Sequence, residues 1–312
     1  MRVIRLQASS PLCAAPVPSA VAIGNFDGLH LGHRAVIFAM QQAAEAAQLV
    51  PSVLSFVPHP RQYFGRTEGG FLLQRLPDKL RLLEALGVAQ VFLVRFNATL
   101  AGWSAQQFAE QLLVQQCAAK HVVTGTNFAF GKGREGDGAV LAHFGAQRGF
   151  STEAVAPVFW HEQVCSSSAI RRCLAEGNMA QASAMLGQYF SIEGRVMHGD
   201  KRGRTIGFPT ANISLHAAQA LPARGVYVVC AEAQGISYTA VANIGLRPSV
   251  GTQVHPTLEV HLLDASPELY GKKCRVSFLH KLRDEQKFDG LEALKAQITR
   301  DVEAARAYVV AL

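Results

Sequence analysis

Three features are missing from this chain of 312 residues, and each absence excludes a class of protein. The six cysteines include no Cys-x-x-Cys pair, which argues against both a disulfide framework and a zinc ribbon. No apolar run approaches the roughly 18 residues that a membrane span requires. No run of five lysines or arginines occurs either, so only the net charge would suggest binding to nucleic acid.

The composition favours a well-packed enzyme for anionic small molecules. Hydrophobic residues make up 49% and charged residues 17%, and the length is sufficient for two domains. A net charge of +7 suits nucleotides and flavin phosphates. Because the segment from Met1 to Leu6 lacks the apolar core of a signal peptide, we expect a cytoplasmic protein with reduced thiols. We expect no nucleic-acid or membrane partner; self-association stays possible.

The first half alternates short apolar runs with helical patterns. The candidate strands lie at 19–23, 50–56, 91–96 and 121–124. Between them apolar residues recur at helical spacing, and the segment from Ser104 to Gln107 has the pattern of a capping box that opens a helix. This alternation predicts a parallel sheet with helices on both faces, and such sheets bind ligands beyond the carboxyl ends of their strands.

The second half contains successive strands without helices between them. The candidate strands lie at 190–196, 226–232, 236–244, 258–263 and 273–279. This pattern predicts an antiparallel barrel or sandwich, followed by a long helix at 291–309. A helical stretch at 167–186 precedes the change of pattern near Gly187. We therefore expect two domains, 1–186 and 187–312.

A segment rich in glycine and histidine follows the first buried strand directly. Residues 24–33 read Gly-Asn-Phe-Asp-Gly-Leu-His-Leu-Gly-His. The glycines allow the backbone to turn closely around a phosphate, and Gly32 would leave room for a ligand between His30 and His33. Two imidazoles at the start of a helix would join its unpaired N–H groups in an anion site. An accidental pair or a metal pair is the alternative, but no third ligand is evident for structural zinc.

This segment resembles the signature of the His-x-Gly-His nucleotidyltransferase superfamily, in the form used by bacterial FAD synthetases. Three more stretches are similar to segments of that family: 56–60 (Phe-Val-Pro-His-Pro), 125–131 (Gly-Thr-Asn-Phe-Ala-Phe-Gly) and 166–171 (Ser-Ser-Ser-Ala-Ile-Arg). Val57 and Thr126 stand where acidic residues are common in the family. A flexible surface loop is the alternative for the glycine-rich residues 131–138, which lack the spacing of a Walker A loop.

The resemblance implies roles for individual residues of the first half. It makes His30 and His33 the catalytic pair of adenylyl transfer. The residues that it implies for ATP binding are Gly24, Phe26, Asp27, Gly28, His30, Gly32, His33, Ser167, Ser168 and Arg171. Those that it implies for flavin or nucleotide binding are His59, Pro60, Asn127 and Phe128.

The segment 194–212 combines glycines with basic residues and ends in Phe-Pro-Thr-Ala-Asn. Glycines allow a backbone to fold over phosphates, while a hydroxyl beside a carboxamide offers hard oxygen ligands for Mg²⁺. From the residues alone, a turn-rich basic loop is the stronger interpretation. The end of the segment, however, resembles the riboflavin kinase motif, and this resemblance implies that Thr210 and Asn212 coordinate Mg²⁺. The residues that it implies for ATP or flavin binding are Gly194, Gly199, Gly203, Gly207, Pro209, Asn243 and Arg247.

Glu259 is the candidate general base, because a carboxylate can accept the proton of a sugar alcohol that attacks phosphorus. The alternative is an ordinary exposed glutamate between the inward-facing Leu258 and Val260. The match of 258–261 to the kinase family favours the base. His261 has no assigned role.

Together the motifs resemble the bifunctional riboflavin kinase/FMN adenylyltransferases, the FAD synthetases. The resemblance implies a Rossmann-like nucleotidyltransferase sheet at the N-terminus and a riboflavin-kinase-type antiparallel barrel with a terminal helix at the C-terminus. ATP would be the co-substrate, and riboflavin, FMN and FAD the substrates and products. Three alternatives stay open: one active half beside a degenerate one, a regulatory flavin-binding module, and a basic nucleic-acid-binding protein.

Overall fold

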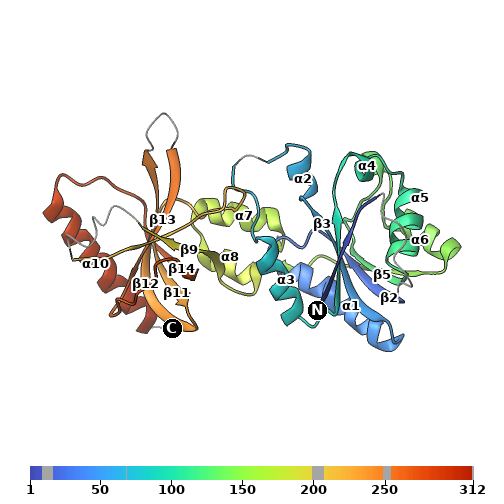
Figure 1. Cartoon of the computed structure of the whole chain (residues 1–312), viewed down its shortest axis with the longest axis horizontal. Helices are drawn as coiled ribbons and strands as arrows, with labels where there is room; N and C mark the ends of the chain where they lie inside the picture. Colours follow the sequence, from blue (N-terminus) through green and yellow to red (C-terminus); the bar gives the residue numbers. More distant parts are fainter. Residues whose placement is uncertain (9–16, 68, 199–206, 249–253, 311–312) are drawn as a thin grey trace. The chain divides into compact units, whose positions relative to one another are not determined.

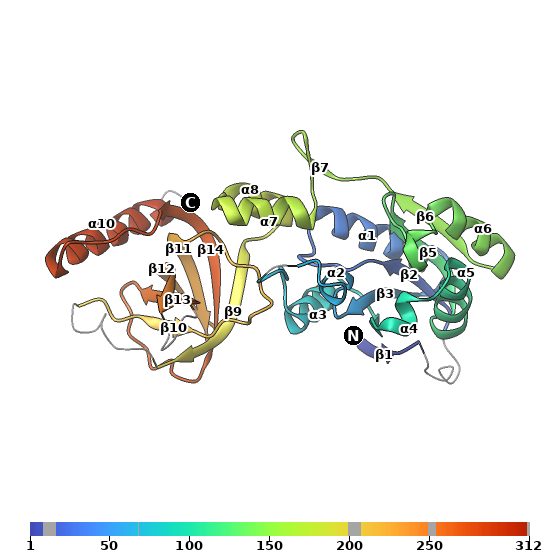
Figure 2. The same ribbon diagram turned by 90° about the horizontal axis from the view of Figure 1, so that it is seen from above.

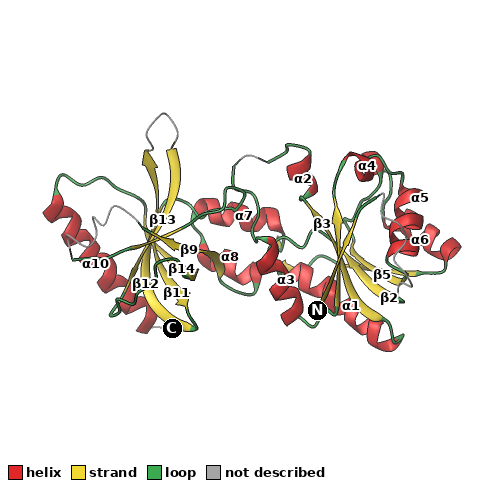
Figure 3. Cartoon of the chain, viewed as in Figure 1, coloured by secondary structure: helices red, strands yellow, loops and turns green. Residues whose placement is uncertain are grey.

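The computed structural model describes residues 1–8, 17–67, 69–198, 207–248 and 254–310. The chain forms two compact units. The first contains Met1–Glu68 and Gln74–Ser166, and the second contains Gly69–Leu73 and Ser167–Leu312. Figure 3 shows alternating helices and strands in the first unit and strands in sequence in the second, as the sequence predicts.

A six-stranded parallel sheet forms the centre of the first unit (Figure 1). Its strands, in sheet order, are β1 (Arg2–Leu6), β4 (Gln90–Arg95), β3 (Val50–Val57), β2 (Ser19–Ile23), β5 (Ala119–Gly125) and β6 (Ser151–Val155). Every neighbouring pair is parallel. From β2 the chain adds β3 and β4 on one side and β5 and β6 on the other, while β1 lies at the edge beside β4. The strand order therefore reverses at β2, and the crevice for ligands is expected at the carboxyl end of this strand.

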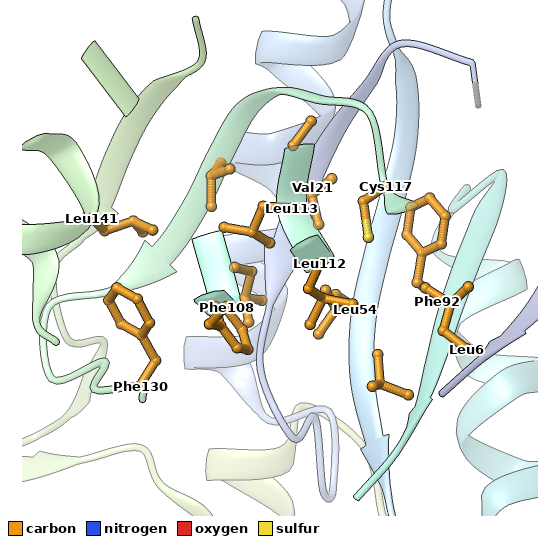
Figure 4. Packing of buried hydrophobic residues seen from close by; sticks show 14 of the residues in the cluster. Leu6, Val21, Leu54, Phe92, Phe108, Leu112, Leu113, Cys117, Phe130 and Leu141 are labelled. Carbon is orange, nitrogen blue, oxygen red and sulfur yellow. The ribbon is translucent and has the colours of Figure 1, made fainter. Parts of the chain in front are cut away.

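Helices cover both faces of this sheet, and the alternation of side chains along β2 separates two cores. Ala20 and Ala22 face a cluster with α1 (Leu31–Ala46) and α3 (Leu76–Ala85). Val21 and Ile23 face the other cluster, where the helical segments Phe108–Gln116 and α6 (Gly138–Arg148) supply Leu112, Leu113 and Leu141. Figure 4 shows the second cluster packed along the sheet. Burial on both faces fixes the position of the β2 end, where the glycine-rich turn begins.

Short helices and one hairpin connect these elements. They are α2 (Pro60–Tyr63), α4 (Ala98–Ala101), α5 (Ala105–Gln107), the 3-10 turn Lys132–Arg134, and the strands β7 (Phe159–Trp160) and β8 (Gln163–Val164). The predicted capping box is present: Ser104 accepts from the N–H of Gln107, and the Gln107 side chain accepts from the N–H of Ser104. The helix then continues with wider, π-type turns over Phe108–Gln116.

The second unit is a closed six-stranded barrel of antiparallel strands with a terminal helix (Figure 2). In barrel order the strands are β10 (Ala211–Ile213), β13 (Val254–Leu262), β12 (Ile236–Pro248), β11 (Gly225–Ala233), β14 (Lys273–Arg283) and β9 (Phe190–Met197). The predicted barrel and the predicted parallel sheet are thus both confirmed.

The terminal helix α10 (Leu291–Val310) packs on the outer face of the barrel. Its Ala305 is fully buried against Val226 and Val228 of β11 and Leu279 of β14. An ion pair fixes the same contact: the Arg283 guanidinium donates to both carboxylate oxygens of Asp301, with Nη2 at 2.8 Å from Oδ2. Apolar burial and a buried ion pair therefore both hold α10.

The predicted helical stretch at 167–186 is made of two helices, α7 (Ser167–Glu176) and α8 (Met179–Leu186). Gly177 breaks the stretch with a φ of +75°, and the side chain of Asn178 caps α8. Both helices belong to the second compact unit. The domain boundary near Gly187 stays a prediction. Within the described ranges, no helix has both the length and the apolar character needed to cross a membrane.

Candidate active sites

The glycine-rich turn leads from the end of β2 into the start of α1. His30 is the N-cap residue of α1, and its Nδ1 accepts from the backbone N–H of His33 at 3.3 Å. A ring nitrogen that accepts this bond carries no proton, so the proton of a neutral His30 ring lies on Nε2. The cap thereby fixes the orientation of the first histidine beside the positive end of the helix.

The two imidazole rings stack directly on each other. Their centroids lie 3.7 Å apart with an interplanar angle of 22°. The expected ligand space between the rings is therefore wrong for this structure. Gly32 serves a different purpose, because a Cβ there would lie 3.1 Å from Cε1 of His30 and 3.3 Å from the Cys165 carbonyl. The glycine makes room for the His30 ring.

Phe26 and Asp27 are buried side chains that pack inside the turn and do not line its surface. Phe26 is almost fully buried and packs edge-on against His33, with ring centroids 5.2 Å apart. Asp27 is equally buried and accepts from the backbone N–H of Gln74 at 3.2 Å. Phe26 and Gly28 both have positive φ angles, +47° and +94°, so the turn is tight. A Cβ at Gly24 would lie 3.1 Å from the Phe26 ring.

His33 lies in an environment that keeps its ring neutral. Burial lowers its pKa well below 6.5, and the charges of His30 and Lys79 lower it further. Its Nδ1 is buried and has no hydrogen-bond partner among the residues that the structure describes. An imidazole of this kind is poised to gain a partner or a proton when an anion binds.

Lys79 is a functional candidate that sequence reasoning missed. It lies in α3, and its side chain is buried with Nζ 2.6 Å from the carbonyl oxygen of Asn25. Burial lowers its pKa, while the charge of Asp27 acts in the opposite direction. The available signal was its place in the helical stripe: Lys79 stands three residues after Leu76 and four before Leu83, where an apolar residue is expected.

A group of aromatic side chains surrounds the other strand ends of the same edge. Phe56 at the end of β3 packs edge-on against Phe96, which follows β4, with centroids 6.0 Å apart. Tyr63 and Phe64 pack against Phe96 from the end of α2, and both are exposed. His59 caps α2 by accepting from the N–H of Arg61. Pro60 is the first residue of that helix. The predicted residues 59 and 60 therefore position an aromatic surface.

The loop after β5 carries the remaining predicted flavin or nucleotide contacts. Asn127 is exposed, and Phe128 is half-buried and stacks on Phe130 with centroids 5.4 Å apart. The following glycine-rich segment is anchored at several points: Glu135 accepts from the N–H of Ala105 at 2.7 Å, and Asp137 caps α6. These bonds argue against an unanchored surface loop.

Ser167, Ser168 and Arg171 lie on the first turns of α7, in the second compact unit. Arg171 donates from Nε to the carbonyl of Phe71 at 2.7 Å, and its guanidinium lies 3.7 Å from the Phe71 ring centroid. Phe71 belongs to the short segment Gly69–Leu73 that is part of this unit. The predicted phosphate contacts of these three residues stay predictions.

In the barrel, three predicted residues occupy one row across three neighbouring strands. Glu259 of β13 is the direct cross-strand partner of Asn212 on β10 and of Asn243 on β12. Directly paired residues point to the same face of a sheet, with Cβ atoms about 4.5–5.5 Å apart. Leu258 and Val260 are buried, so Glu259 points away from the barrel interior and is half-buried. The register brings a carboxylate and two carboxamides together.

His261 holds the Phe-Pro-Thr-Ala-Asn segment against β13. Its Nδ1 lies 2.8 Å from the carbonyl oxygen of Pro209, and its ring packs edge-on against Phe208. Because a carbonyl only accepts, Nδ1 carries the proton of this bond. Thr210 follows directly and is half-buried. The histidine that sequence reasoning left without a role therefore positions the segment that contains both predicted Mg²⁺ ligands.

The glycines predicted to contact ligand in the kinase half differ in what the structure shows around them. Gly194 lies in β9, where a Cβ would be 2.2 Å from the Ser214 carbonyl oxygen, so close packing of the backbone explains it. Gly207 has a φ of +90° and open space around its Cα. Gly199 and Gly203 lie outside the described residues, as does the side chain of Arg247. Their ligand contacts stay predictions.

Comparison with known proteins gives the same assignment for both halves. The FAD synthetase family model matches residues 14–169, and the riboflavin kinase model matches residues 186–309. A bifunctional riboflavin kinase/FMN adenylyltransferase from Escherichia coli is 42% identical over 301 residues, 95% of each chain. The chain belongs to this family. The enzyme of the same name from Haemophilus influenzae is 42% identical over 93% of this chain and 94% of its own.

More distant members of the bifunctional riboflavin kinase/FMN adenylyltransferase family match over the same length. The Bacillus subtilis member is 38% identical over 93% of this chain and 92% of its own. A crystal structure described as a macrolide-efflux protein from Streptococcus pneumoniae has a TM-score of 0.88, 30% identity, and covers 98% of this chain and 99% of that one. It gives the fold an experimental counterpart. The two family models and the curated relatives agree on the flavin enzymes, so the efflux description stays with that protein.

Proposed function

We propose that the chain makes FAD from riboflavin in two ATP-dependent steps, one in each half. The second half phosphorylates riboflavin to FMN, and the first half joins FMN to the adenylyl group of ATP. The observation that carries this proposal is the match of both halves, in the same order, to the two enzymatic family models. The residues predicted for each half offer the chemical groups that the corresponding reaction would need.

In the kinase step, the row of β10, β13 and β12 is the proposed centre. Glu259 accepts the proton of the terminal ribityl hydroxyl while that oxygen attacks the γ-phosphorus of ATP. The bond between the γ-phosphorus and the bridging oxygen breaks, and ADP leaves. Asn243, directly opposite Glu259, is placed to orient the carboxylate or the substrate. The reaction requires positioning and charge neutralisation but no protein nucleophile.

The residues at the end of the Phe-Pro-Thr-Ala-Asn segment fit Mg²⁺ by their donor chemistry. Thr210 and Asn212 offer a hydroxyl and a carboxamide oxygen, which are hard ligands of the kind Mg²⁺ prefers. When bound with ATP, Mg²⁺ would neutralise charge on the phosphates. His261 holds the segment just before Thr210, and strand pairing of β10 holds Asn212.

In the transferase step, a phosphate oxygen of FMN attacks the α-phosphorus of ATP, and pyrophosphate leaves. His30 and His33 are proposed to donate to the phosphate oxygens, where negative charge grows in the transition state. The N-terminus of α1 adds unpaired N–H groups and the positive end of the helix dipole. Ser167, Ser168 and Arg171 are the proposed partners on α7, supported only by the family motif.

The aromatic surface at the ends of β3 and β4 is the proposed site for the flavin ring of FMN. Exposed Tyr63 and Phe64 offer ring faces, and aromatic stacking suits a flat heterocycle. Asn127 and Phe128 border the same edge of the sheet, because parallel strands end on one side. We also propose the domain division 1–186 and 187–312, a cytoplasmic location and possible self-association, for which the sequence is the support.

The test is a product assay on the whole chain. Riboflavin with Mg-ATP should give FMN and then FAD, and FMN with Mg-ATP should give FAD and pyrophosphate, all measured by chromatography. FMN without FAD would mean that only the kinase half is active. Val57 and Thr126, which stand where acidic residues are common in the family, would then be the positions to change back to acidic residues. Binding of flavin without any turnover would exclude both activities and leave a regulatory module.

A further inference from the structure

A buried lysine contacts the turn of the transferase site from a different element of the same unit. Lys79 of α3 is 7% exposed, and it donates from Nζ to the carbonyl oxygen of Asn25 at 2.6 Å. Lysine is almost never fully buried without a partner or a purpose, because removing an ammonium group from water is costly. A residue of this kind requires an explanation that packing alone does not give.

The Asn25 carbonyl has a second donor, which provides an internal comparison. The hydroxyl of Ser55 on β3 donates to the same oxygen at 3.1 Å, and Ser55 is completely buried. The carbonyl would therefore keep a hydrogen bond without the lysine. A neutral donor would hold the backbone at lower cost, so the positive charge of Lys79 is the property to be explained.

The surroundings of Lys79 direct this charge toward the catalytic pair. The lysine is close enough to His33 to lower the pKa of that ring. Burial lowers the pKa of Lys79 itself, and the Asp27 carboxylate acts against this by favouring the charged ammonium. Asp27 is itself held by the N–H of Gln74, just before α3. Two bonds thus connect the α3 region to the turn between β2 and α1, one to Asp27 and one to Asn25.

We propose that Lys79 is a positioning residue of the adenylyl-transfer site: it fixes the Asn25 turn and supplies a buried positive charge beside His33 for the bound phosphates. The inference rests on the proposed function of the histidine pair. Before ATP binds, burial lowers the pKa of His33 most, and the charges of His30 and Lys79 lower it further, so all three favour a neutral ring. When the phosphates bind, the charge of Lys79 attracts them, since a buried charge acts at a low effective dielectric constant.

The experiment compares Lys79→Met with two matched controls in the full chain. Ser55→Ala removes the other donor to the Asn25 carbonyl without removing charge, and Lys120→Met removes an exposed lysine of the same unit. We expect Lys79→Met to weaken pyrophosphate binding, measured by calorimetry, at least about tenfold, as expected for one charge-assisted contact. FAD formation from FMN should fall at least as much. FMN formation from riboflavin should change less than about twofold, since the barrel is untouched.

A second measurement separates charge from packing. The pKa of the His33 ring, followed by NMR without ligand and assigned with a His33→Asn variant, should rise in Lys79→Met and stay unchanged in Ser55→Ala. Lys79→Gln keeps a donor for the carbonyl but has no charge, so we expect the same losses as for Lys79→Met. It provides the test if the methionine variant does not fold.

Three outcomes would overturn the proposal: wild-type pyrophosphate affinity in both uncharged variants, an equal loss in Ser55→Ala, or an unmoved pKa of His33. If the wild-type chain itself made no FAD from FMN, the proposed function would fail first. The assay therefore distinguishes that failure from failure of the role of Lys79.

Discussion

In the first unit the candidate catalytic residues are neighbours in the sequence, whereas in the second they come from three strands far apart in the chain. His30 and His33 meet because one helix cap and one turn bring them together. Asn212, Asn243 and Glu259 meet because the barrel register aligns them. The transferase site therefore depends on local backbone geometry, while the kinase site depends on correct strand pairing. Substitutions should affect the two activities separately.

The largest expected effect is on the histidine pair. The double variant His30→Ala, His33→Ala should lower FAD formation from FMN at least about a thousandfold, because it removes two groups that stabilise charge on the phosphates. FMN formation should persist. The measurement is chromatography of flavins after incubation with Mg-ATP, and His143→Ala, on the exposed side of α6, is the control. Equal loss of FMN formation and FAD formation in a folded variant would contradict the assignment of the two activities to separate sites.

For a substitution in the barrel we expect the opposite result: loss of FMN formation with FAD formation from supplied FMN retained. Glu259→Gln should lower FMN formation by about a hundredfold or more, the usual contribution of a general base, and leave adenylylation of supplied FMN intact. Glu232→Gln, an exposed change on β11, serves as the matched control. If Glu259→Gln retained full kinase activity, Glu259 would be an ordinary outward-facing strand residue, the alternative that the alternating strand pattern leaves open.

A third variant examines what holds the kinase unit together. Asp301→Ala should lower the free energy of unfolding of this unit by about 3–5 kcal/mol, because Arg283 would lose both carboxylate oxygens in a partly buried position. Calorimetry or denaturant unfolding would measure the change, with Glu303→Ala on the exposed side of α10 as control. An unchanged stability would mean that apolar packing alone fixes α10.

The smallest expected effect is a pH dependence confined to the first unit. The folded pKa of His33 lies below its ordinary value of 6.5, so the unfolded chain binds a proton first as the pH falls. The free energy of unfolding should therefore decrease as pH falls below 6.5, by up to about 1.4 kcal/mol per pH unit until the folded pKa is reached. Unfolding of wild type and His33→Asn between pH 5 and 7.5 measures it. The same slope in both would exclude His33 as the source.

Much of the fold was predictable because buried elements have distinct patterns. The strands at 19–23 and 91–96 are apolar on both faces, and the structure places them within one residue of the prediction. The strands β1 and β6 were missed, since both lie at the edges of the sheet and carry exposed polar residues. β12 continues past the predicted end at Ile244, because its ladder with β13 extends to Pro248.

The candidate sites were predictable only where their residues share a short segment. The start of α1 at the histidine pair follows from local sequence, and so does the capping box at Ser104. The contact between Lys79 and Asn25 spans 54 residues, and the contact between His261 and Pro209 spans 52. The local signal for Lys79 is a polar residue in an otherwise apolar stripe, whereas His261 stands at an outward-facing strand position where a polar residue is ordinary.

The grouping of α7 and α8 with the barrel matters for anyone who wants to express one activity alone. The helix that carries Ser167 and Arg171, which we propose for the transferase reaction, lies within the same compact unit as the barrel. Ending the chain at 186 would strip the barrel from α8 and expose its buried Met185 and Leu186 to solvent. Ending it at Ser166 would discard the proposed phosphate contacts. The limit of a foldable fragment and the limit of an active one thus differ by about twenty residues.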